Sequence, residues 1–164
     1  MVLELGMTLL PTFAIIFGFL DIGFAIFTWN TLQNATREGT RYAITMQVQG
    51  SNGQRQSIKN QTAAWSMNFV NAASTSTTGA AIPYVQVDFY DPNSNPPTVL
   101  TTATANSPGN IVEVSIRNYP YRWMFPFTGT VVSPFYAAPG GTLSIAVYSA
   151  DVLGGTGLSG LPAI

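Results

Sequence analysis

The sequence predicts an α+β fold: a long N-terminal hydrophobic helix and a short second helix packed on a small antiparallel β-sheet. Two observations carry this prediction. Apolar residues recur at spacings of three and four in the first part of the chain, whereas from Ala80 onward they alternate with polar residues. We therefore divide the chain into a long helix, residues 1–50, and a globular α+β head with a glycine-rich C-terminal tail, residues 51–164.

The apolar run from Leu5 to Trp29 is long enough to cross a membrane, because a hydrocarbon core about 30 Å thick needs roughly 20 helical residues. The helical period continues beyond it, so we predict one helix from about Val2 to about Gln49, roughly 70 Å long. Its second half must therefore pack on soluble structure. Pro11 lacks a backbone N–H, which predicts a kink or local opening there.

Two carboxylates, Glu4 and Asp21, are the only charges before residue 30. A carboxylate near the bilayer centre costs about 3 kcal/mol, and no basic residue follows Asp21 within four positions. We predict that the α-amino group of Met1 meets Glu4 or Asp21 of another copy. The alternatives are an interfacial charge without a role at Glu4, and a residue beside a lipid-embedded water defect at Asp21.

The remaining elements follow from turn signals and period. Glycines at 50 and 53 end the first helix, and an amphipathic helix follows over about residues 54–73. Strands are predicted where apolar and polar residues alternate, over residues 85–90, 112–117 and 143–147, with a weaker one over 98–104. The connections are rich in proline, glycine and asparagine, which favours an antiparallel sheet with one face covered by the long helix.

Composition excludes several functions. The formal net charge is −1, from six basic and seven acidic residues, so we predict no nucleic-acid partner. The chain has neither cysteine nor histidine, which removes disulfides, cysteine nucleophiles, Ser-His-Asp sites and most transition-metal sites. We predict no enzymatic activity, no cofactor and no metal.

An aromatic stretch near the end of the second long strand is a candidate surface. If exposed, it would mark a contact with another subunit or with a bound surface; capping of the sheet edge explains it equally well. Its candidate contact residues are Tyr119, Tyr121, Trp123 and Phe125.

Three blocks in order resemble the TadE-like pilins of the Tad (Flp) branch of type IV filament systems. They are VLE at residues 2–4 leading into the run with Pro11, GFLDIG at 18–23, and LQNATREGTRYA at 32–43. The third block is the most specific. VEVSIRNYP at 112–120 and GTLS at 141–144 are similar to the later half of the family. The resemblance is strong up to about Ala43 and looser beyond.

The resemblance implies a life cycle. Such pilins carry a basic leader that a prepilin peptidase removes. They are then held in the inner membrane until a membrane assembly platform moves them into an extracellular pilus. The missing basic region before the apolar run fits this cleavage. Glu4 corresponds to a glutamate that relatives usually carry at the fifth mature position. Relatives also commonly carry a basic residue soon after the position of Asp21, and this chain does not.

These observations predict a structural subunit of a pilus that forms a homopolymer through its N-terminal helix. Two alternatives stay open. The chain could be a minor pilin or pseudopilin that acts in assembly, or a membrane-anchored, adhesin-like binding module that uses the aromatic stretch.

Overall fold

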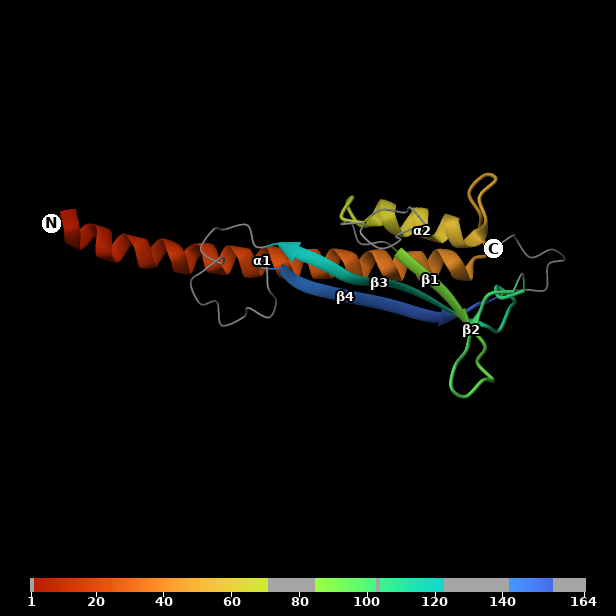
Figure 1. The fold of residues 1–164 in the computed structure, drawn as a ribbon. Helices are drawn as coiled ribbons and strands as arrows, with labels where there is room; N and C mark the ends of the chain where they lie inside the picture. The colour runs from red at the N-terminus through yellow and green to blue at the C-terminus, as the bar shows by residue number, and fades with distance from the viewer. Residues whose placement is uncertain (1, 71–84, 103, 123–141, 155–164) are drawn as a thin grey trace. The chain divides into compact units, whose positions relative to one another are not determined.

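The computed structural model describes residues 2–70, 85–102, 104–122 and 142–154 (Figure 1). The described elements are two helices followed by four strands, which confirms the predicted α+β class. In chain order they are α1 (Val2–Ile44), α2 (Gln54–Trp65), β1 (Val85–Tyr90), β2 (Val99–Leu100), β3 (Ile111–Arg122) and β4 (Thr142–Val152).

The strands form one sheet in the order β2-β1-β3-β4. β1 runs antiparallel to both of its neighbours, and its register with β3 extends from Val85 opposite Ile116 to Tyr90 opposite Ile111. The predicted antiparallel sheet is therefore confirmed, and β4 lies at one side of it.

The chain separates into two compact units. The helix unit comprises Met1–Trp29 and Pro120–Ile145, and the head unit comprises Asn30–Tyr119 and Ala146–Ile164. The division of the chain into residues 1–50 and 51–164 stays a prediction.

The head unit has a core of its own because the apolar residues of β1 and β3 are buried as the sequence predicts. The predicted alternation is exact in β1 but not in β3, where Ser115 is buried as well. α2 contacts β1, and the second half of α1 contributes small and branched side chains to the same core. The buried apolar residues of this core include Leu32, Ala35, Ala43, Ile58, Val85, Val87, Phe89, Val112, Val114, Ile116 and Val147. The helices thus cover one face of the sheet, as expected.

Both helices end earlier than predicted. α1 ends at Ile44 instead of Gln49, and Met46 follows with φ 54°. α2 ends at Trp65 instead of Ala73, and Met67 and Asn68 have φ 54° and 66°. Left-handed residues cannot continue a right-handed helix, so these residues terminate both helices in place of the glycines that usually do so.

A buried amide pair ties the end of α1 to a distant loop. Gln54 donates a hydrogen bond to the carbonyl oxygen of Ala43 at 3.2 Å, and Asn106 donates to Oε1 of Gln54 at 2.7 Å. Gln54 and Asn106 are fully buried. The pair supplies a donor to one of the carbonyls that a helix end leaves without an intrahelical partner.

Candidate assembly interface

The first part of α1 leaves its apolar side chains uncovered within the helix unit. Met7 and Phe19 are 76% and 71% exposed, and the side chains described between residues 6 and 20 are exposed or half-buried. The best 18-residue window of α1 has a mean hydropathy of 2.1 and is 6% buried. By length and composition α1 can cross a membrane. Apolar surface of this extent requires a cover of lipid or protein.

Pro11 lies inside this bare stretch and is itself exposed. The helix continues across it, although the missing N–H leaves the carbonyl of Met7 without its usual intrahelical donor. The hydroxyl of Thr12, the residue after Pro11, donates to the carbonyl of Thr8 at 2.7 Å. Nearby, Phe13 and Phe17 stack with ring centroids 5.8 Å apart. The predicted kink or opening at Pro11 stays a prediction.

Asp21 is the first described residue of α1 with a buried side chain, only 2% exposed, while Ile22 and Phe24 beside it stay exposed. Ala25 and Thr28 follow on the same helical face and are 8% and 5% exposed. The hydroxyl of Thr28 donates to the carbonyl of Phe24 at 2.9 Å, so the buried hydroxyl group keeps a hydrogen-bond acceptor. From Asp21 onward, one face of α1 is therefore covered by the chain itself.

Tyr121 supplies part of that cover. Its side chain is 6% exposed, and its hydroxyl donates a hydrogen bond to the backbone carbonyl of Asp21 at 3.2 Å. This contact joins the end of β3 to α1 within the helix unit. This contact was not predicted from the sequence, although the sequence contains a signal for it. The small buried residues of α1 in the head recur at spacings of three and four, and Asp21, Ala25 and Thr28 extend that pattern toward the N-terminus.

The other predicted site residues have different surroundings. Tyr119 packs edge-on against Phe69, with ring centroids 6.2 Å apart, and burial raises the pKa of its hydroxyl. Glu4 lies in α1, but its side chain is outside the described residues, as are Met1, Trp123 and Phe125. Intersubunit roles for the first residues, and a surface role for the aromatic stretch, stay predictions.

The block at residues 32–43 packs the head. Gly39 is buried where α1 approaches α2 and β3: a Cβ atom placed on it would overlap Oγ1 of Thr62 and lie 3.3 Å from Cγ1 of Val114. Leu32, Ala35 and Ala43 on the same side are fully buried. The exposed side carries Arg41, which pairs with Glu38 at 3.1 Å. Small residues in this block thus allow the close helix approach.

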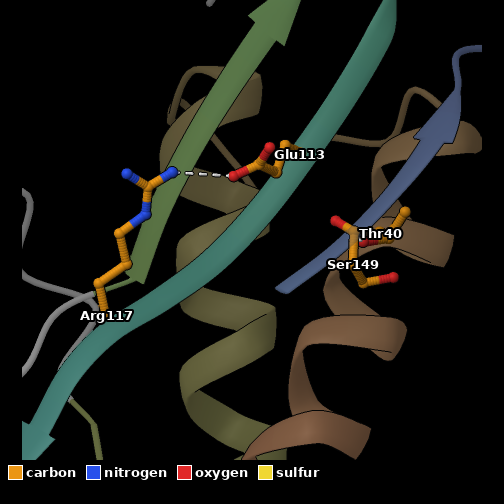
Figure 2. Close-up of polar contacts among 4 residues, drawn as sticks. All are labelled: Thr40, Glu113, Arg117 and Ser149. Carbon is orange, nitrogen blue, oxygen red and sulfur yellow. Dashed lines mark hydrogen bonds and ion pairs between the residues drawn. The ribbon is translucent and has the colours of Figure 1, made fainter. Parts of the chain in front are cut away.

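Side chains of α1 also reach β4 in the head unit. The hydroxyl of Thr40 lies 2.9 Å from the carbonyl oxygen of Thr36 and 3.2 Å from that of Ser149, and has one proton to donate between them (Figure 2). Gln33 donates from Nε2 to the carbonyl oxygen of Tyr148 at 3.2 Å. Two consecutive carbonyls of β4 therefore lie within hydrogen-bond distance of donors on one helix, and the Thr40 donor is shared with Thr36.

The charged groups of the head are few, and four of those described form two local ion pairs. Arg117 and Glu113, on the same face of β3, form an ion pair at 3.0 Å (Figure 2), which is half-exposed and of small energetic value. Lys59 is largely buried; desolvation and then the charge of Arg55 lower the pKa of its amine, against the opposing effect of Asp88. Among the described residues no three acidic side chains gather into a metal site.

Comparison with known proteins locates the similarity in α1. The family model of the TadE-like proteins matches residues 1–41, which confirms the resemblance to that family over this segment. No curated protein and no solved structure matches the chain. The match covers about a quarter of the chain and lies within α1, the helix that is long and apolar enough to cross a membrane.

Proposed function

We propose that this chain is a structural subunit of an extracellular Tad-type pilus and polymerises through α1. One observation carries the proposal: residues 6–20 present bare apolar surface on a chain whose head unit has its own core. Lipid covers this surface while the subunit is stored, and other copies cover it in the polymer. The TadE-like match over residues 1–41 supports a pilus as the polymer.

The proposal includes a path for the subunit. A prepilin peptidase cleaves it, the inner membrane holds it, and an inner-membrane assembly platform moves it into the pilus. The chain itself has a structural and not an enzymatic role, and its main partners are copies of itself. The apolar α1 is the part that both the membrane and the polymer contact.

Glu4 is the residue we assign to register between copies, paired with the α-amino group of Met1 of a neighbour. Asp21 is the weaker choice because its own unit covers it. Leaving one member of a buried ion pair alone costs about 3–5 kcal/mol, so misaligned copies would be disfavoured by that amount. The pair therefore selects one alignment more than it adds net stability.

Replacement of Glu4 by glutamine tests this assignment. We expect Glu4→Gln to reduce filament yield strongly while the subunit still accumulates in the membrane with a folded head. Glu38→Gln is the matched control, because it makes the same chemical change at a surface ion pair on the head side of α1. Unaltered filament yield in Glu4→Gln would sink the register role.

The subunit's abundance tests the structural role itself. Electron microscopy of appendages sheared from the source cells, with mass spectrometry of the same fraction, should find thin filaments composed mainly of this chain. A scarce chain among filaments of another subunit would identify a minor pilin instead. A chain that stays wholly in the membrane fraction would favour an anchored binding module.

A further inference from the structure

Two cationic side chains, Arg55 and Lys59, lie one turn apart on α2, the helix that contacts β1 in the head unit. Residues four apart in a helix are neighbours on its surface, so the two charges lie close together. Lys59 is only 9% exposed, and Arg55 is half-buried. Charges withdrawn from water in this way are usually compensated by an anion.

An aromatic ring, and not an acid, holds Arg55. Its guanidinium carbon lies 5.3 Å from the centroid of the ring of Phe89, which is fully buried. Nε of Arg55 is buried and has no hydrogen-bond partner in the described part of the chain. A guanidinium over a ring keeps its N–H groups in its own plane, so the outer ones remain available to an anion.

No described acidic group forms an ion pair with either cation. The other acidic side chains of the head unit form local ion pairs or accept hydrogen bonds from nearby backbone amides; they are Glu38, Asp91, Glu113 and Asp151. Asp88 attracts the Lys59 amine, but burial and then Arg55 have larger effects and lower the pKa of that amine. The two cations therefore lack a counter-charge within the residues that the structure describes.

The start of α2 adds positive potential beside Arg55. The N-cap is Gly53, which supplies no side-chain hydrogen bond, and the first turn contains no acidic residue. The partial positive charge of a helix start favours a nearby anion. It reinforces the field of the two side chains.

We propose that Arg55 and Lys59 bind a phosphate group, either inorganic phosphate or a phosphomonoester. A phosphomonoester carries about −1.5 to −2 charges near neutral pH, which balances two cations. The planar fork of an arginine donates parallel hydrogen bonds to phosphate oxygens, and a lysine adds a compact charge. A carboxylate carries a single charge and would leave part of the pair uncompensated.

Thermal unfolding of the full chain in a detergent without phosphate groups tests the site. When inorganic phosphate replaces chloride at equal ionic strength and neutral pH, the natural chain should unfold at a higher temperature, because a ligand that binds only the folded state stabilises it. Lys59→Met and Arg55→Met should each lose most of this gain. Arg37→Met is the matched control and should keep it, because Arg37 is an exposed cation of the same unit. The general stabilising effect of phosphate on folded proteins is common to all four proteins.

NMR of ¹³C-dimethylated Lys59 gives a second measurement that does not depend on unfolding. Dimethylation keeps the charge of the amine, and a bound phosphate favours the charged form. Phosphate should therefore raise the midpoint of the Lys59 titration relative to chloride at equal ionic strength. Acetate should leave the midpoint unchanged, and an acetate effect equal to that of phosphate would overturn phosphate as the ligand.

Two results would overturn the site itself. One is a Lys59 midpoint that phosphate does not move, and the other is an equal gain in unfolding temperature in the natural chain and Lys59→Met. Glycerol 3-phosphate distinguishes the two sources of the ligand: an effect equal to that of inorganic phosphate supports a monoester, and an effect of inorganic phosphate alone supports the free ion. None of these results bears on polymerisation through α1, because both binding residues belong to α2.

Discussion

A Cβ atom added at Gly39 would overlap Oγ1 of Thr62, so α1 and α2 approach each other at a point where only glycine fits. The hydroxyl of Thr62 is held by a 2.8 Å hydrogen bond to the carbonyl of Ile58, and Cγ1 of Val114 would lie 3.3 Å from the added Cβ. Neither neighbour can move away freely. The position explains in physical terms why a glycine stands inside a helix, where it usually weakens the structure.

Gly39→Ala should therefore destabilise the head by about 1–3 kcal/mol, because the extra methyl group overpacks the helix crossing. Gly23→Ala is the control: no atom lies within 4 Å of its added Cβ, and alanine favours the helix by up to about 1 kcal/mol. Thermal unfolding of the full chain in detergent, followed by circular dichroism, measures both. Equal unfolding temperatures in the two variants would contradict the overlap.

Tyr121→Phe should cost about 1 kcal/mol, because it removes the hydrogen bond to Asp21 while keeping the buried ring. Tyr148→Phe makes the same change at a side chain that is 70% exposed and should leave stability unchanged. Chemical denaturation of both variants in detergent gives the comparison. An equal effect at the two positions would show that the Tyr121 hydroxyl makes no net contribution.

Asn118 has φ 58° within β3, next to exposed Arg117, so the alternation of the strand breaks there. A β-branched residue resists this left-handed conformation, so Asn118→Val should lose about 1–2 kcal/mol. Asn118→Gly should stay close to the natural chain because glycine adopts positive φ freely. If valine were tolerated as well as glycine under the same denaturation assay, the left-handed conformation would be wrong.

Lys59 is the only lysine in the sequence, so after ¹³C-dimethylation its NMR titration has to be separated only from that of the α-amino group, which titrates at lower pH. The midpoint should lie below that of a dimethylated lysine in an unfolded peptide, because burial and Arg55 lower the pKa. The unfolded chain then binds more protons than the folded one between the two pKa values. The contribution of Lys59 to stability should rise with pH across that window.

Lys59→Met removes this dependence and checks its sign. The variant should be more stable than the natural chain at neutral pH, and the difference should shrink as the pH approaches 10.5. Unfolding at a series of pH values measures the difference directly, and the titrating tyrosines are common to both proteins. A difference that grows with pH would contradict the assigned direction.

The sequence could predict the elements because local period and turn residues determine them. The alternation at residues 85–90 predicts β1, and the glycine at 53 marks the start of α2. The helix ends were harder to predict. Positive φ angles after the helices occur at Met46, Met67 and Asn68, none of which is the glycine that usually marks a helix end. The sequence therefore gave no signal for these two helix ends.

The candidate assembly interface was also predictable from the sequence only in part. The bare apolar stretch of α1 could be predicted from composition alone. The burial of Asp21 could not, because it depends on which strand end reaches that turn of the helix, and Tyr121 lies a hundred residues away. The local sequence shows Asp21 only as a single charge in an apolar run, whereas in the folded chain its side chain is buried.

The two hydrogen bonds from α1 to the carbonyls of Tyr148 and Ser149 protect an outer strand. Successive carbonyls of a strand point to opposite sides, so one of this pair faces away from β3. Outer strands with free backbone groups recruit strands from other molecules and promote aggregation. If the chain polymerises as proposed, Gln33 and Thr40 would shield this stretch of the outer strand and leave association between copies to the helices.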